Sequence, residues 1–211
     1  LVPLALAGVD CRALLKGAAQ ALPRLEGSSG IEKDVLAARD LVLVTYRAEL
    51  APLAFWLQQL WAESLGKRLK DGAPSPFPLP VWCEGPRDQH ALFQMFLEGD
   101  PRRVFLFMDV EGGLPGPQVD LEGMEKLLPG VPSPLLLGDA LRACREGTAL
   151  AIAAQGLPVY RWVLQRNAAS LAAFMAWSLD RTYRFAFALG VDPHGQPAVE
   201  AGKARTRALL K

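Results

Sequence analysis

Apolar residues in this chain follow two spacings, one typical of helices and one typical of buried strands. Between residues 51 and 65, Leu53, Trp56 and Leu60 recur three or four positions apart, so they share one face of a helix. Leu41–Val44 is instead a short continuous apolar run with β-branched members, which is typical of a strand buried on both faces. The same criteria predict helices over residues 11–22, 32–39, 51–65, 88–97, 136–155, 169–189 and 198–209, and strands over residues 41–44, 80–83, 104–108 and 159–163.

Strands and helices alternate along the whole chain, which predicts βαβ units. We therefore expect an α/β fold, a three-layer sandwich with a mostly parallel sheet covered by helices on both faces, formed by residues 1–211 as one domain. Two Gly/Pro-rich stretches, 71–80 and 111–134, predict loops, the second with a short amphipathic piece over 121–128. Open sheets of this kind bind ligands at the carboxyl ends of their strands.

Composition excludes several classes of partner. The chain has 211 residues, 51% of them hydrophobic, and a net charge of +1, so it can bury a sizeable core but carries no field that would attract nucleic acid or acidic membranes. No apolar run approaches the roughly 20 residues needed to span a bilayer. The three cysteines, Cys11, Cys83 and Cys144, lie far apart and form no metal-binding spacing. They predict reduced, buried thiols and a reducing compartment such as the cytoplasm.

The opening Leu-Val-Pro-Leu-Ala-Leu-Ala-Gly has no positive leader and no methionine. It is typical of a helix cut at its start rather than of a signal peptide. We therefore expect a fragment or a separately expressed domain of a longer protein.

Three polar islands interrupt the apolar pattern: Glu63–Lys67, Gly85–His90 and Gln196–Lys203. Glu63 ends a predicted helix, where the helix dipole does not favour a carboxylate, so it suits a proton-accepting base. The alternative is a solvated glutamate at a helix end. His90 begins another helix, where Asp88 and Gln89 are expected to cap the helix and orient the ring. The alternative is a capping or packing role for His90 itself.

The remaining candidates also allow two interpretations. Lys203 follows Glu200 by three positions, which fits an exposed helical ion pair as well as a catalytic ammonium. Gln196 is expected to cap the last helix or to reach a hydroxyl or phosphate oxygen. Gly85 permits close approach of the backbone to a ligand. His194 stands in Asp-Pro-His-Gly, a turn signal, and we interpret it as a surface turn residue.

Taken together, the islands resemble the glucose-6-phosphate isomerase family. Glu63-Ser-Leu-Gly-Lys67 resembles the family's Met-Glu-Ser-Asn-Gly-Lys segment, and residues 85–94 resemble a segment in which Gly, Gln-His and a later Gln recur. Residues 191–203 resemble the signature Asn-Pro-Phe-Asp-Gln-Pro-Gly-Val-Glu-x-Gly-Lys. The order of the three matches, and the resemblance covers essentially the whole chain but only the later half of the family's length.

The resemblance implies a fold of the sugar-isomerase type and a role for each candidate. In this family a glutamate base moves a proton between C1 and C2 of the sugar through a cis-enediol, which would be the role of Glu63. A histidine and a lysine assist opening of the pyranose ring, so His90, acting in the neighbouring subunit's site, and Lys203 would do so here. Gln196 would contact the phosphate end of the sugar phosphate, with Gly85 lining the site. The family's reaction uses no metal and no organic cofactor.

The resemblance also implies partners. The family's phosphate-binding serines and threonines and a transition-state arginine belong to the first sugar-isomerase domain or to the segment before the second. We therefore expect an N-terminal half of the same enzyme, a homodimer, and an isolated chain without turnover. Some family members also carry a transaldolase domain upstream, which the sequence leaves open.

Several positions depart from the family pattern. Leu65 replaces the usual Asn, Asp88 stands where many members have Asn-Gly, His194 and Gly195 replace Phe-Asp, and Ala198 replaces Gly. The loop before the last island is therefore expected to have its own shape. Two rival interpretations remain: a sugar-phosphate-binding or dimerisation module without turnover, and a generic α/β domain with chance matches.

Overall fold

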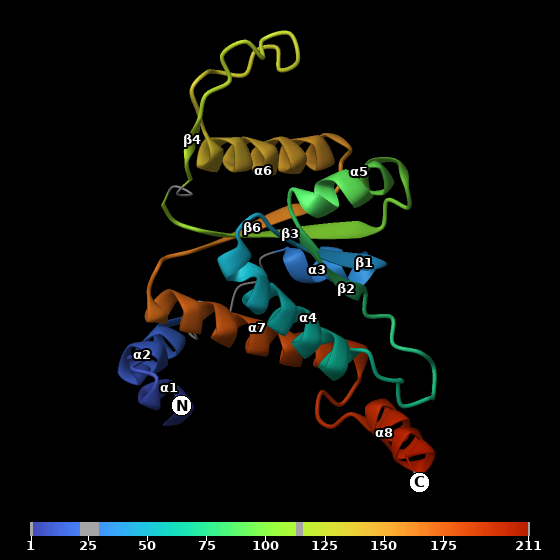
Figure 1. The fold of residues 1–211 in the computed structure, drawn as a ribbon. Coiled ribbons are helices and arrows are strands. Elements are labelled where there is room, and N and C mark those ends of the chain that lie inside the picture. The colour runs from blue at the N-terminus through green and yellow to red at the C-terminus, as the bar shows by residue number, and fades with distance from the viewer. Residues whose placement is uncertain (1, 22–29, 113–115, 211) are drawn as a thin grey trace.

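The chain folds around one parallel sheet. The computed structural model describes residues 2–21, 30–112 and 116–210. The sheet has four strands in the order β2-β1-β3-β6, and every neighbouring pair is parallel (Figure 1). The strands are β1 (Asp40–Thr45), β2 (Leu79–Glu84), β3 (Arg103–Val110) and β6 (Val159–Leu164). The predicted α/β class, the parallel sheet and all four predicted strands are confirmed.

The predicted helices are present as well, with ends shifted by at most two residues. They are α2 (Cys11–Ala21), α3 (Ile31–Ala37), α4 (Ala51–Leu65), α5 (Arg87–Glu98), α6 (Leu137–Ala154), α7 (Ala168–Leu189) and α8 (Pro197–Leu209). The structure also contains the short helix α1 (Val2–Leu6) and the 3-10 turn η2 (Ala48–Leu50). The predicted end of the helix over residues 11–22 lies outside the described residues.

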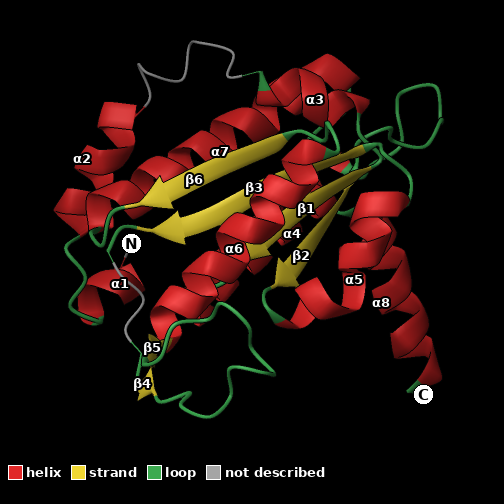
Figure 2. Cartoon of the chain, turned by 90° about the horizontal axis from the view of Figure 1, so that it is seen from above, coloured by secondary structure: helices red, strands yellow, loops and turns green. Residues whose placement is uncertain are grey.

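Helices cover both faces of the sheet because both faces are apolar. Leu41 and Leu43 face one layer, where the core includes residues of α3, α4 and α7. Val42 and Val44 face the other layer, where α5 and α6 supply the partners. Figures 1 and 2 show the two layers on either side of the strands. Each fully buried aliphatic side chain contributes about 1.5–3 kcal/mol, so this alternation is the main source of stability.

An aromatic cluster joins α4 to α7. The Trp61 ring lies 6.1 Å from that of Trp177 and 5.8 Å from that of Phe185, measured between centroids. Its indole nitrogen donates to the Thr182 hydroxyl at 3.1 Å. An ion pair between Arg181 and Glu32 ties α7 to α3 on the same side of the sheet. The helix α7 therefore organises the whole layer.

The Gly/Pro-rich stretch after β3 is an exposed excursion, as predicted. Its described part contains only β4 (Gln118–Val119), which pairs antiparallel with β5 (Leu135–Leu136). Residues 121–128 form turns without a helix. This excursion extends beyond α6 and away from the sheet (Figure 1).

One prediction about the core was wrong. Only Cys83 is buried, while Cys11 and Cys144 are partly exposed, so the prediction of three buried thiols was wrong. Each of the two lies on a helix rather than on a strand that is covered on both faces. Burial raises the pKa of the Cys83 thiol to about 12. In addition, α8 contributes no buried residue to the core.

The crossing of α2 over α7 depends on Gly17. A Cβ at this position would lie 2.3 Å from the backbone oxygen of Ala169, the second residue of α7. We expect Gly17→Ala to lower the free energy of unfolding by about 1–3 kcal/mol, because backbone atoms must move apart to admit the methyl group. Urea denaturation of the purified protein measures the change.

Gly147→Ala is the matched control for that substitution. Gly147 also lies inside a helix, but a Cβ there would meet nothing within 4 Å. Alanine should stabilise this position by about 0.5–1 kcal/mol through its better helix propensity. Equal effects of the two substitutions would show that the contact between α2 and α7 does not limit the size of residue 17.

Candidate functional site

Two of the predicted site residues, Glu63 and Gln196, meet at the end of α4. The Gln196 amide donates to Oε2 of Glu63, and the Gln59 amide donates to Oε1 at 3.0 Å. Each carboxylate oxygen therefore accepts an amide N–H. Gln59 was missed by sequence reasoning, although its position four residues before Glu63 on the same helix face is a usable signal.

A loop from the far end of the chain brings Gln196 to this place. The Lys67 ammonium donates to the backbone oxygens of Asp192 and His194, each at 2.7 Å. Burial lowers the pKa of Lys67, and the Asp192 carboxylate partly offsets this. Lys67 is thus the second contributing residue that sequence reasoning did not single out.

His194 lies on the surface of the same loop, as predicted for a turn residue. Its backbone N–H and its Nδ1 atom contact Oδ1 of Asp192 at 2.9 and 2.8 Å, and its Nε2 atom lies 3.2 Å from the Tyr183 hydroxyl. The N–H bond from His194 keeps the pKa of Asp192 below its ordinary value. These contacts give the loop a defined shape despite its departure from the family pattern.

The surface beside Glu63 is hollowed. An open pocket of about 310 Å³ is lined by Glu63, Ser64, Pro193, Gly195, Gln196 and Glu200. Its size is at the lower end of sites that hold small molecules. The lining is polar, and it offers a carboxylate and an amide side by side.

Lys203 is also on this side of the molecule, but it is engaged elsewhere. Its ammonium pairs with Glu200 at 2.7 Å on the exposed helix α8. The described contacts do not join it to Glu63. The arrangement is the exposed helical ion pair that the sequence offered as an alternative.

His90 lies at the opposite edge of the sheet from Glu63. It sits in the first turn of α5, directly after the carboxyl end of β2, where the sequence placed it. In contrast, α4 starts after the carboxyl end of β1 and runs back, so that the Leu65 carbonyl accepts from Ser75 in the segment before β2. The carboxyl edge therefore carries His90, and the amino edge carries Glu63 and Gln196.

The expected capping of α5 by Asp88 and Gln89 was wrong. No side chain caps this helix. The Asp88 carboxylate instead accepts the Glu84 N–H at 2.7 Å, and the Gln89 carbonyl accepts the Tyr46 hydroxyl at 2.7 Å. His90 itself is exposed.

Tyr46 packs against Gly85 and bonds to Gln89, in the segment just before His90. Its hydroxyl contacts the Thr148 hydroxyl at 2.8 Å while donating to Gln89, so Thr148 supplies the other proton. A Cβ on Gly85 would lie 2.4 Å from the Tyr46 ring. The close approach that Gly85 permits in this structure is thus to Tyr46. Burial raises the pKa of Tyr46, which keeps the phenol protonated as a donor.

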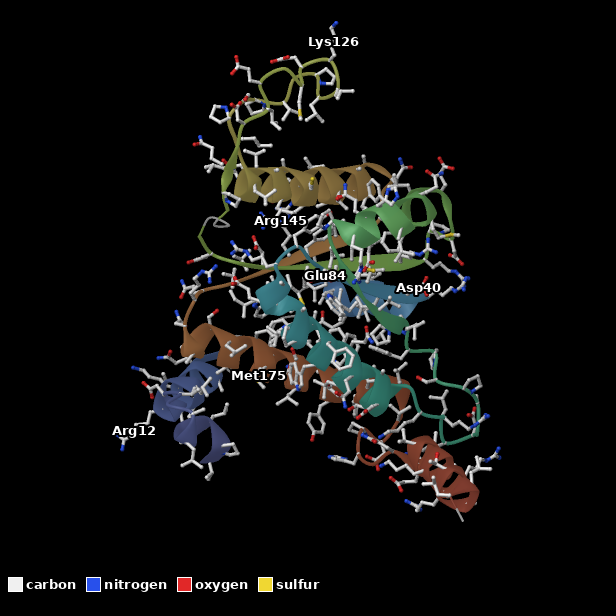
Figure 3. All side chains as sticks on the ribbon, viewed as in Figure 1. Arg12, Asp40, Glu84, Lys126, Arg145 and Met175 are labelled. Atoms are coloured by element: carbon white, nitrogen blue, oxygen red, sulfur yellow. The ribbon has the colours of Figure 1, made fainter. Side chains whose placement is uncertain are left out.

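A charged network lies at the same edge and was also missed. The buried Arg47 donates to the Asp109 carboxylate at 2.8 Å and to the Val110 carbonyl at 3.1 Å. Arg145 reaches Asp109 from α6, between that helix and the sheet (Figure 3). Arg47 also pairs with Glu49, and Arg145 pairs with Glu146. Each arginine of this group therefore has carboxylate partners, and the group holds the turn after β3.

Two kinds of feature are absent from the residues that the structure describes. None of the helices in this part of the chain is both long and apolar enough to cross a membrane. No three His, Cys, Asp or Glu side chains there gather as metal ligands would.

Sequence relatives cover the whole chain. A glucose-6-phosphate isomerase of Rubrobacter xylanophilus is 34% identical over 228 residues, which include 100% of this chain and 50% of that protein. A probable glucose-6-phosphate isomerase of Halobacterium salinarum is 32% identical over 222 residues, with 98% and 49% covered. No protein-family model matches the chain.

Two solved structures share the fold of nearly the whole chain. A hypothetical protein from Thermus thermophilus has a TM-score of 0.80 at 30% identity and covers 99% of this chain and 52% of its own. A glucose-6-phosphate isomerase from Chlamydia trachomatis has a TM-score of 0.64 at 19% identity, with 94% and 42% covered, and shows likeness of fold alone.

The parallel sheet between two helix layers defines an α/β sandwich like that of sugar-isomerase domains. Over its whole length, the chain is a homologue of the glucose-6-phosphate isomerases. It spans about half the length of the curated relatives it matches.

The hydroxyl of Tyr46 provides a test of the support under His90. We expect Tyr46→Phe to lower the free energy of unfolding by about 1–3 kcal/mol, because Thr148 and Gln89 each lose a partner in a largely buried place. Adding Thr148→Val should cost less than its effect in the wild-type background, since the two hydroxyls act as one unit. Thermal unfolding of the four proteins measures the coupling.

Tyr183→Phe is the matched control, because Tyr183 is 55% exposed. It should change stability by less than about 0.5 kcal/mol. Strict additivity of Tyr46→Phe and Thr148→Val would contradict the proposed hydrogen-bonded unit.

Proposed function

We propose that this chain is the C-terminal sugar-isomerase domain of a glucose-6-phosphate isomerase. In this proposal it takes part in the interconversion of glucose 6-phosphate and fructose 6-phosphate, by proton transfer through a cis-enediol and without metal or organic cofactor. The observation that carries the proposal is the contact between Glu63 and Gln196, which lie 133 residues apart in sequence. It joins two separate motifs that resemble the family at one polar pocket.

In this proposal Glu63 is the base. Its carboxylate takes the proton from C2 of the open-chain aldose while O1 gains a proton, and returns it to C1 of the enediol while O2 loses one, so one group serves both steps. Amide donors on both oxygens hold the carboxylate in one orientation. A positioned base of this kind contributes roughly 10²–10⁴ in rate. Gln196 also lines the pocket, so its amide is available to a hydroxyl or phosphate oxygen of the sugar.

Ring opening would use His90 and Lys203. Because His90 and Glu63 lie at opposite edges of one sheet, a shared site needs His90 from a second copy of the chain. This separation supports the proposal of a homodimer in which each site borrows a histidine. Lys203 would have to exchange its Glu200 partner for the substrate, which costs little for an exposed ion pair.

The other half of the enzyme would supply phosphate recognition. The chain spans half the length of its relative, which supports a second domain as partner. An apolar stripe along α7 supports it as well: Leu171, Leu179, Tyr183 and Phe187 are exposed, with Phe187 at 90%. Met175, labelled in Figure 3, lies on the same helix four residues after Leu171 and is partly exposed. Residues four apart are neighbours on a helix surface. Exposed apolar side chains that gather in this way mark contacts between domains or chains.

The proposal is tested by exchange of subunits in the full-length protein. We expect Glu63→Gln to lower turnover of glucose 6-phosphate by at least about 100-fold, because the amide cannot accept the proton. His90→Ala should also be impaired on the cyclic sugar. When the two inactive proteins are mixed and allowed to exchange, heterodimers with one intact site should regain part of the activity.

Glu98→Gln is the matched control, since Glu98 also ends a helix and is exposed. It should retain wild-type turnover. If Glu63→Gln retains more than about a tenth of the activity, Glu63 is not the base, and a binding or dimerisation module is favoured. Lack of rescue, with subunit exchange demonstrated, would refute the shared site.

The isolated chain should fold but not catalyse. Its core is complete on both faces of the sheet, so we expect cooperative thermal unfolding. Without phosphate recognition it lacks the remote binding energy that supports turnover. We also expect self-association through the α7 stripe. Calorimetry, sedimentation and a turnover assay on one sample test all three, and robust turnover by this chain alone would overturn the proposal of a half-enzyme.

A further inference from the structure

The Lys67 ammonium bonds to two backbone carbonyls. It donates to Asp192 and His194 at 2.7 Å each, across 125 and 127 residues of sequence. Two carbonyl oxygens replace the water that a lysine at a helix end ordinarily keeps. The contact therefore joins the end of α4 to the loop between α7 and α8.

That loop has few other attachments. In the described part of the chain, the hydrogen bonds that join residues 192–210 to the rest of the protein are those from Lys67 to two backbone carbonyls, the one between His194 and Tyr183, and the one from Gln196 to Glu63. The buried Val191, just before these residues, anchors the start of the loop in the core. The helix α8 buries no residue, so apolar packing does not hold it in place. Figure 1 shows α8 beyond the end of α7, away from the sheet.

We propose that Lys67 is a positioning residue that acts through Gln196: it holds the loop 192–196 against α4 so that the Gln196 amide reaches Glu63. The consequence for catalysis rests on the proposed function, while the mechanical role does not. The lowered pKa of Lys67 agrees with an ammonium that has lost part of its water to these carbonyls.

The geometry explains why the lysine must follow Glu63 closely. Glu63 lies in the last turn of α4, and Gly66 ends the helix. Lys67 is the first residue beyond the helix, so its side chain can turn toward the loop while Glu63 keeps its place on the helix face. Any displacement of the loop then moves the amide donor relative to the carboxylate that it orients.

A first measurement concerns the loop alone. We expect Lys67→Met, which keeps the length of the side chain and removes its donors, to speed hydrogen exchange at the Val199 and Glu200 amides at least tenfold. These amides donate to the Gln196 carbonyl at 3.1 and 3.2 Å in the first turn of α8. The control Lys70→Met changes an exposed lysine three residues on and should leave these rates unchanged.

A second measurement concerns catalysis in the full-length protein. Lys67→Met should lower kcat for glucose 6-phosphate by about 10- to 100-fold, as misplacement of an orienting group by about 1 Å does. In a Gln196→Ala background the same substitution should cost less than about threefold, because the group it positions is gone. A role in general stability would instead give the same loss in both backgrounds.

The two proposals fail in different ways. Unchanged hydrogen exchange in Lys67→Met, or equal losses of kcat with and without Gln196, would overturn the role of Lys67. Full turnover by Glu63→Gln would overturn the proposed function, and in that case hydrogen exchange alone decides whether Lys67 holds the loop.

Discussion

The constraint on which this structure depends is that a parallel sheet must be covered on both faces. Each strand is followed by a helix that returns across the sheet before the next parallel strand begins. The start of a helix therefore lies at the carboxyl edge, and its end lies at the amino edge. Glu63, at the end of α4, and the loop after α7 are brought to the same edge by this rule.

The same rule separates His90 from Glu63. Residues in the first turn of a crossover helix cannot meet residues in the last turn of another, because the length of the sheet lies between them. Ligand sites in open α/β sheets usually lie at the carboxyl edge. Here the contact between Glu63 and Gln196 lies at the other edge. A site that uses Glu63 together with His90 would therefore need His90 from a second subunit.

The fold was predictable from local pattern, but the contacts of the site were not. Leu41–Val44 identified a strand buried on both faces because every residue of that run is apolar. By contrast, the partners of Lys67 are backbone carbonyls more than 120 residues away, which no periodicity encodes. The sequence around Asp88 and Gln89 predicted that they cap α5. In the structure the Asp88 carboxylate accepts the Glu84 N–H instead, and the Gln89 carbonyl accepts the Tyr46 hydroxyl. Motif resemblance named Glu63 and Gln196, but only the folded chain brings their side chains into contact.

The sheet core and the loop 192–196 are held in place by interactions of different free energy. A buried strand residue such as Leu43 contributes about 1.5–3 kcal/mol through apolar burial. A hydrogen bond at a partly exposed place, such as those of Lys67, contributes a net of only about 0.5–1.5 kcal/mol. Substitutions in the loop 192–196 should therefore change the geometry around Glu63 without unfolding the sheet. A site attached in this way is free to be completed by another domain or subunit, because its final arrangement is not already fixed by the core.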